Sequence, residues 1–174
     1  MPSATDSADP STPTGSATDV ARAFYDAFSR HDAEVMVRLY HPQATFHDAV
    51  FGTLTAAQTA AMWRMLLGSS ADMSVSSVLL GLEGRTKGIQ TARVRWDAHY
   101  KFSSTGRPVH NVVYARLTVQ DGLIVRHTDR FNFWVWSQQA PGLLLGWTPM
   151  LHRRVSETAL AGLKASQQSA ADSG

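Results

Sequence analysis

The sequence predicts an α+β domain in which helices cover one face of a curled antiparallel sheet. Two observations lead to this class. Apolar residues recur at three- and four-residue spacing up to residue 67, which is typical of helices, and at two-residue spacing from residue 73, which is typical of strands. Helices followed by a run of strands pack as two layers, because each element must bury one apolar face. With 174 residues, of which 44% are hydrophobic, the chain fits one domain.

Three helices are predicted before residue 68, and the first two form a hairpin. Thr18 or Asp19 caps the first helix, which stops near Arg30. Asp32 caps the second, which Pro42 ends because proline cannot donate the next helical hydrogen bond. The residues expected to face the core are Val20, Ala23, Phe24, Ala27 and Phe28 in the first helix, and Val35, Met36, Leu39 and Tyr40 in the second.

A short strand is expected at residues 44–48, between the second helix and the third. Thr55 and Gln58 form a capping box that opens the third helix, which runs to Leu67 and is closed by Gly68. Turn-forming residues then divide the following segment into the four long strands of an antiparallel meander, and these turns lie at residues 84–88, 103–106 and 120–122.

Both ends of the chain are expected to lie outside the folded domain, which spans residues 19–165. Residues 1–18 are small and polar, with neither a basic segment nor an apolar run, and they indicate a disordered tail rather than a signal peptide. Residues 166–174 have the same character. Inside the domain, Pro149 stands at a first helical position and starts a C-terminal helix that ends near Leu163.

The composition argues against several classes of protein. The formal net charge is only +2 and the arginines are spread along the chain rather than gathered in one block, so the clustered basic face of a nucleic-acid-binding protein is not expected. No apolar stretch approaches the roughly eighteen residues of a membrane span. Without cysteines the chain has no disulfides and no thiolate chemistry. We expect a cytoplasmic protein that binds neither nucleic acid nor membrane.

One face of the predicted sheet is polar and suits a contact between two copies of the chain. In the second long strand the packed side consists of Val94, Trp96, Ala98, Tyr100 and Phe102, and the opposite side of Arg93, Arg95, Asp97, His99 and Lys101. We expect a homodimer through the sheet, formed by Arg93, Arg95, His99, Tyr114 and Arg116 together with the tryptophan-rich end of the sheet.

The last long strand carries two ionisable side chains on its apolar side. Burying an unpartnered polar group costs roughly 2–7 kcal/mol, so His127 and Asp129 are expected to line a pocket for a small molecule. Their positions lie roughly 6.5–7 Å apart along the strand, and we expect them to flank a bound molecule rather than contact each other. A structural role for both is the alternative. Alternation places Leu123, Val125, His127, Asp129, Phe131, Phe133 and Val135 on this side.

Two further polar residues are candidates for the same pocket. Asp48 shares the parity of Phe46 and would stand at the rim, where partial burial raises the pKa of a carboxyl toward that of a general base; an exposed turn residue is the alternative. Asn111, on the apolar side of its strand, would either fix an oxygenated ligand or bridge two strands. No metal site is expected, because the histidines show neither HxxxH nor HExxH spacing.

The chain resembles the nuclear transport factor 2-like superfamily in its helix hairpin and in three segments. These are Ala-Thr-Phe-His-Asp-Ala-Val-Phe-Gly at 44–52, Thr-Gly-Arg-Pro-Val-His-Asn at 105–111 and Asp-Gly-Leu-Ile-Val-Arg-His-Thr-Asp at 121–129. The superfamily includes ketosteroid isomerases, SnoaL-like polyketide cyclases and limonene epoxide hydrolases. The resemblance covers about residues 20–136 and implies a cone-shaped fold around a small-molecule site.

The resemblance also implies roles for individual residues. Asp48 matches the catalytic base of the isomerases, whereas Phe24 and Ala115 stand where the isomerases have their oxyanion-binding tyrosine and aspartate. Trp96 stands in place of the arginine of the epoxide hydrolases. Asp129 matches an aspartate of those hydrolases and fits best the acid/base aspartate of SnoaL-like cyclases.

These observations predict an acid/base enzyme of the isomerase, cyclase or hydrolase type, acting without a cofactor on a hydrophobic oxygenated molecule such as a polyketide or a steroid-like ketone. Asp129 is the predicted principal acid/base, His127 its partner and Asp48 an auxiliary base, with Trp63 or a tyrosine hydroxyl orienting Asp129. The alternative is a non-catalytic small-molecule-binding or dimeric interaction module. The predicted substrate-binding residues are Asn111, Phe24, Trp63, Trp96, Tyr100 and Phe131.

Overall fold

The α+β class is confirmed by a computed structural model, which describes residues 15–69, 72–86, 88–102, 105–140, 161, 164 and 168. The elements in chain order are α1 (Ala17–Ser29), α2 (Ala33–Arg38), β1 (Tyr40–Asp48), β2 (Gly52–Thr55), α3 (Ala56–Ser69), β3 (Ser74–Thr86), β4 (Ile89–Lys101), β5 (Pro108–Gln120), β6 (Leu123–Phe131) and α4 (Phe133–Gln139). The predicted helix from Pro149 to about Leu163 lies almost wholly outside the described residues.

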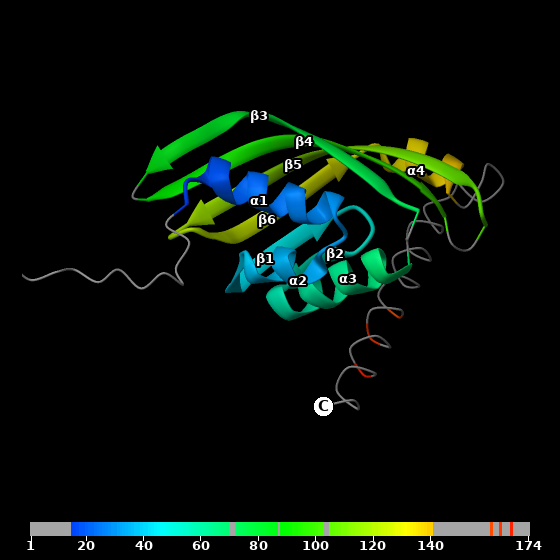
Figure 1. The fold of residues 1–174 in the computed structure, drawn as a ribbon, viewed down its shortest axis with the longest axis horizontal. Coiled ribbons are helices and arrows are strands. Elements are labelled where there is room, and N and C mark those ends of the chain that lie inside the picture. Colours follow the sequence, from blue (N-terminus) through cyan, green and yellow to red (C-terminus); the bar gives the residue numbers. More distant parts are fainter. Residues whose placement is uncertain are drawn as a thin grey trace, which may run out of the picture.

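The strands form one six-stranded mixed sheet in the order β2-β1-β6-β5-β4-β3. Strands β3 to β6 make the predicted antiparallel meander, and β1 adds a parallel pairing with β6. Helix α1 lies across one face of the sheet, against β3, β4 and β5, whereas α3 packs on β1 and β2 (Figure 1). We call the face toward α1 the inner face; it carries Val94, Trp96, Ala98, Val113, Ala115, His127 and Asp129. The opposite side is the outer face.

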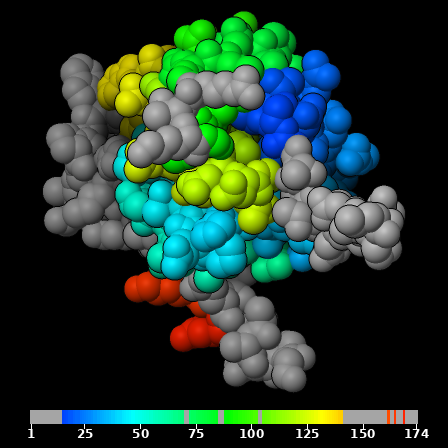
Figure 2. Space-filling model, turned by 90° about the vertical axis from the view of Figure 1, so that its left-hand side faces the viewer, coloured from blue at the N-terminus to red at the C-terminus, as the bar shows by residue number. Residues whose placement is uncertain are grey.

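Aromatic side chains fill the space between α1 and the inner face. Phe24 is fully buried, and its ring centroid lies 5.8, 5.7 and 5.3 Å from those of Tyr40, Trp63 and His127. Of the stripe predicted for the first helix, Ala23 alone is exposed. In Figure 2, which faces one end of the domain, α1 (blue) lies beside the sheet (green to yellow-green), and the β1 region (cyan) lies below them.

The helix starts follow local side-chain chemistry. α1 begins earlier than predicted, because Ser16 and Asp19 form a capping box in which each side chain bonds the backbone of the other. Asp32 caps α2 as predicted, and Thr55 and Gln58 exchange the two bonds of the predicted capping box at α3.

Strand β6 differs from the predicted alternation at both ends. Thr118 pairs with Arg126 and Val119 with Ile124, so one extra residue of β6 forms a bulge. Ile124 is therefore fully buried, and the predicted inward facing of Leu123 and Val125 in strict alternation is wrong.

The strand also ends earlier than predicted, at Phe131, instead of running on to Trp136. Asn132 caps α4 by accepting a hydrogen bond from the Val135 N–H at 3.1 Å. Phe133 and Val135 are therefore helical rather than alternating strand residues.

The outer face is polar, as predicted. Glu83 forms ion pairs with Arg93, at 3.3 Å, and with Arg116, and Asp97 does so with Arg95 at 3.0 Å. Tyr114 is 53% exposed. A homodimer through this face remains a prediction. Among the described residues, no helix has both the length and the apolar content to cross a membrane.

Candidate functional site

The two ionisable residues of β6 form a buried hydrogen-bonded pair. His127 Nε2 lies 3.0 Å from Asp129 Oδ1, and the two side chains are 0% and 4% exposed. Their predicted position on the inner face is confirmed, but the prediction that they do not contact each other is wrong. Side chains on a strand lean along its direction, so the imidazole spans a gap that the spacing of the backbone positions overstates.

A tyrosine and a tryptophan extend this pair into a line of four side chains, which we call the polar chain. Trp63 Nε1 donates to Tyr40 Oη at 3.1 Å, and Tyr40 Oη lies 2.6 Å from His127 Nδ1. Since an indole N–H only donates, the tyrosine oxygen accepts from Trp63 and its own proton points to Nδ1. A neutral His127 then carries its proton on Nε2, and this N–H donates a hydrogen bond to Asp129 Oδ1. The tautomer is thus assigned from the hydrogen-bond partners of the two ring nitrogens.

The sheet order explains how these residues meet. Strand β1 runs parallel to β6 and places Phe46 opposite His127, while Tyr40 stands at the start of β1 and Trp63 comes from α3. Tyr40 was assigned to the stripe of the second helix from its spacing, and this was wrong because α2 ends at Arg38. The proline at position 42 was the available signal, since the residue before a proline favours an extended backbone.

Asp48 lies at the other end of β1 and is half-buried. Its Oδ1 accepts hydrogen bonds from the N–H groups of Val50, at 2.9 Å, and Phe51, at 2.6 Å. Burial raises the pKa of Asp48 from 3.8 to about 6; the Phe51 bond opposes this rise, and the Asp129 carboxylate adds to it. Asp48 is thus a partly buried carboxyl rather than the exposed turn residue of the alternative, although it also bonds the turn that follows β1.

Two aromatic donors in the same layer have no acceptor in the described part of the chain. Tyr25 Oη and Trp96 Nε1 are buried, and the described structure gives neither a hydrogen-bond partner. The whole residues are 4% and 8% exposed. Burial, followed by the charge of Asp129, raises the pKa of the Tyr25 hydroxyl well above its ordinary value. An unpaired buried donor costs about 1–3 kcal/mol, so these two groups are unusual in a well-packed core.

Comparison with known proteins now identifies the family, because the model of the "SnoaL-like domain" family matches residues 21–127. The chain belongs to the SnoaL-like domain family. No curated protein matches it. The predicted superfamily is thereby confirmed, together with the fold class.

Solved structures share the fold of this SnoaL-like domain at low identity. IdmH, a putative polyketide cyclase from Streptomyces antibioticus, is 20% identical, with a TM-score of 0.56 over 72% of this chain and 98% of that one. A ketosteroid isomerase-like protein from Erwinia carotovora atroseptica is 10% identical, with a TM-score of 0.58 over 66% and 92% of the two chains. An epoxide hydrolase of M. tuberculosis that is similar to limonene epoxide hydrolases is 16% identical, with a TM-score of 0.54 over 76% and 92%.

The other predicted binding residues of the SnoaL-like domain do not all lie at the polar chain. Phe24 and Trp63 pack directly on the His127 ring, with centroid distances of 5.3 and 6.3 Å. Asn111 is half-buried on the inner face, opposite Ala98 of β4. Tyr25 and Tyr40 were missing from the sequence-based set of site residues.

Tyr100 and Phe131 belong to an aromatic cluster at α4 rather than to the polar chain. Trp136 Nε1 donates to Tyr100 Oη at 2.8 Å, and the ring centroid of Phe131 lies 6.2 Å from that of Trp136.

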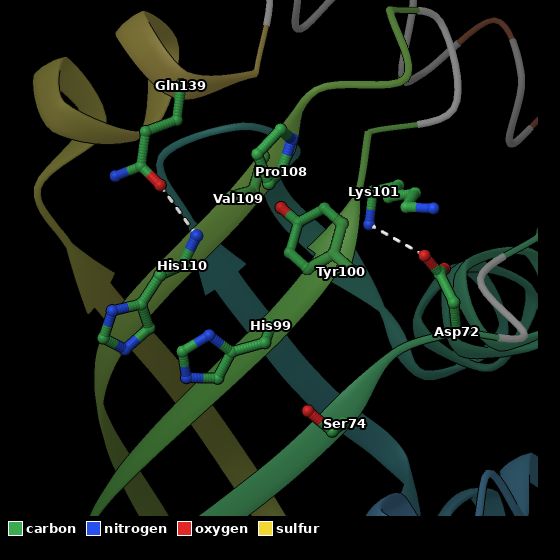
Figure 3. Close-up of a pocket in the computed structure, with 9 residues that line it drawn as sticks. All are labelled: Asp72, Ser74, His99, Tyr100, Lys101, Pro108, Val109, His110 and Gln139. Carbon is green, nitrogen blue, oxygen red and sulfur yellow. Dashed lines mark hydrogen bonds between the residues drawn. The ribbon is translucent and has the colours of Figure 1, made fainter.

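A surface hollow of about 390 Å³ adjoins this cluster and is lined by the residues labelled in Figure 3. It includes the rings of His99 and His110, stacked with centroids 4.1 Å apart, and Tyr100, but not the polar chain. Within the described ranges, no three His, Asp or Glu side chains are grouped to hold a metal ion.

Proposed function

We propose that this SnoaL-like domain is an acid/base enzyme that moves protons on a hydrophobic, oxygenated small molecule. The buried pair of His127 and Asp129 carries the proposal, since ionisable groups held 3.0 Å apart among aromatic rings are costly to fold and cluster at functional sites. Asp129 is the principal acid/base. Its Oδ1 is bonded to His127, whereas the described residues give its Oδ2 no hydrogen bond, which leaves this oxygen for a substrate proton.

His127 acts as the partner of Asp129, and two residues position it. With its proton on Nε2, the imidazole stabilises the Asp129 carboxylate and can accept charge when a proton is transferred. Tyr40 and Trp63 do not act on the substrate in this scheme; they hold the ring and its tautomer through Nδ1. Asp48 is an auxiliary base, because a carboxyl with a pKa of about 6 is largely ionised near neutral pH yet still basic enough to take a proton.

The substrate class follows from the groups around the pair. Phe24, Phe46 and Trp63 surround His127 and favour an apolar molecule, and an acid/base group acts where that molecule carries oxygen. A polyketide or a steroid-like ketone meets both requirements. Neighbours described as polyketide cyclases and as ketosteroid isomerase-like support this choice by analogy of fold alone.

The experiment follows exchange of carbon-bound hydrogen, which requires no knowledge of the final product. Hydrophobic ketones and β-dicarbonyl compounds are incubated with the protein in D₂O, and deuterium uptake beside the carbonyl is measured by NMR and mass spectrometry. We expect uptake above the no-protein control, and a decrease of about 10²–10⁴ in rate for Asp129→Asn. Asp26→Asn is the matched control, because it removes an exposed carboxylate from α1. An Asp129→Asn variant that exchanges at the wild-type rate would exclude Asp129 as the acid/base.

A second candidate function is a non-catalytic small-molecule-binding or dimeric interaction module. The observation that favours it is the pairing of both ring nitrogens of a fully buried His127, because this arrangement would also serve to join β6, β1 and α3. The module would be stabilised by a ketone in a thermal-shift assay while promoting no deuterium uptake above the no-protein control. Uptake that depends on Asp129 would reject it.

A further inference from the structure

Unpaired donors mark a part of the inner layer that the polar chain does not use. The aromatic donors Trp63, Tyr40 and Trp136 each have a bonding partner. Tyr25 Oη and Trp96 Nε1 are buried as deeply and have none within the described structure. Since buried donors in folded proteins are almost always satisfied, two exceptions in one layer call for an acceptor that the described residues do not supply.

The rings of the two donors both pack against the same residue of α1. Phe28 touches both rings, with centroids 6.4 Å from Tyr25 and 5.2 Å from Trp96. Trp96 pairs with Val113 of β5, one row along the inner face from the pairing of Ala115 with Asp129. Burial raises the pKa of the Tyr25 hydroxyl, and the charge of Asp129 adds to this rise. These contacts place both side chains in the layer between α1 and the inner face, which also holds the acid/base pair.

The charges of this region define the ligand further. The buried polar and charged residues described are Thr59, His127, Asp129 and Ser137, with neither lysine nor arginine among them. The carboxylates of Asp129 and Asp48 repel an anion, and nothing buried in the described part of the chain compensates with a fixed positive charge. Two neutral donors without a cation suit an uncharged oxygen, such as a ketone carbonyl, better than a carboxylate or a phosphate.

We propose that Tyr25 Oη and Trp96 Nε1 form a binding subsite for an uncharged carbonyl oxygen of the ligand. This inference rests on the proposed function for the kind of ligand, and it assigns the ligand's orientation: the oxygen lies against α1 and β4, and the adjoining carbon atoms face Asp129. The sequence predicted Trp96 as a substrate-binding residue without assigning it a carbonyl oxygen, and it did not predict Tyr25 as a site residue.

Removing an unpaired donor should lower the affinity for the ligand without lowering the melting temperature of the protein. Tyr25→Phe breaks no hydrogen bond that the described residues make, so its melting temperature should be unchanged or higher. Binding of 2-acetylnaphthalene, a neutral apolar ketone, should weaken about 3- to 10-fold, the effect of one neutral hydrogen bond. Trp96→Phe should weaken binding similarly. The melting temperature of this variant does not report on the hydrogen bond alone, because the smaller ring also removes packing volume. Tyr114→Phe and Trp134→Phe are matched controls at exposed positions.

The binding assay is titration calorimetry, and infrared spectroscopy of the ¹³C-labelled carbonyl reports its hydrogen bonds directly. In the wild-type protein the C=O stretch should lie below its value in an apolar solvent, and Tyr25→Phe should move it part of the way back. Absence of ketone binding to the wild-type protein, an unchanged affinity and stretch in both variants, or a lower melting temperature of Tyr25→Phe would overturn the subsite. Failure of the proposed catalysis is a separate result. In that case the rate of deuterium uptake is the same in the wild-type protein and in Asp129→Asn, while the ketone still binds.

Discussion

Replacing Asp48 by asparagine should stabilise the protein at neutral pH and leave its stability in acid unchanged. Asparagine has the same shape, and its Oδ1 can accept the same two hydrogen bonds from the N–H groups of Val50 and Phe51. The variant loses only the negative charge, which burial disfavours first and the Asp129 carboxylate disfavours further.

The magnitude follows from the pKa of Asp48, which rises from 3.8 to about 6 on folding. A raised pKa means that the folded protein binds the proton more tightly than the unfolded chain. The stabilising contribution is therefore fully present below about pH 4 and is lost as the pH rises to about 6. Each pKa unit corresponds to about 1.4 kcal/mol, so the loss is at most about 3 kcal/mol. Because Asp48 is only half-buried, solvent screening lowers the expected gain of Asp48→Asn to about 1–2 kcal/mol at pH 7.

The assay is denaturant unfolding of both proteins from pH 4 to pH 8, followed by tryptophan fluorescence. The difference in the free energy of unfolding should be near zero at pH 4, grow up to about pH 6 and then stay constant. Asp26→Asn, on the exposed side of α1, controls for the change in net charge. A difference that does not vary with pH, or an Asp48→Asn protein less stable than wild type at pH 7, would refute the reasoning, because the bonds of the carboxylate would then outweigh its burial.

Three further substitutions test the hydrogen bonds and the packing of the domain. Tyr40→Phe leaves His127 Nδ1 and Trp63 Nε1 without partners and should lower the free energy of unfolding by about 2–4 kcal/mol in denaturant titrations; a loss below 1 kcal/mol would contradict the polar chain. Phe24→Ala should cost about 3–5 kcal/mol in the same assay, and a small loss would show that the layer between α1 and the sheet collapses readily. Asn132→Ala should cost about 1 kcal/mol and speed amide hydrogen exchange in α4, whereas unchanged exchange there would deny its role as the cap.

Local chemistry accounts for what could be read from the sequence. The capping box at Thr55 and Gln58 and the cap at Asp32 involve residues three positions apart, so their signals are complete within one short segment. Turn residues and two-residue alternation likewise locate β3 to β6. His127 and Asp129 were found in this way, since a polar residue on an apolar side is visible from parity alone.

Long-range pairing explains what the sequence concealed. Tyr40 lies 87 positions from His127 along the chain, and the two meet because β1 runs parallel to β6. Tyr25 occupies a helical position that looks like ordinary core, and only the packed structure shows that its hydroxyl has no acceptor among the described residues. Such features depend on which elements become neighbours, and no local pattern reports that choice.

The bulge in β6 reconciles two demands on one strand. Ile124 is fully buried, and its N–H donates to the Leu39 carbonyl at 2.8 Å, which ties the start of β6 to the end of α2. His127 stands three positions later, and in a regular strand an odd separation would send one of the two side chains to the outer face. The extra residue between them lets both face inward. The same strand can therefore anchor the core at one end and hold the acid/base pair at the other, so the site depends on this irregularity as much as on the alternation that first indicated it.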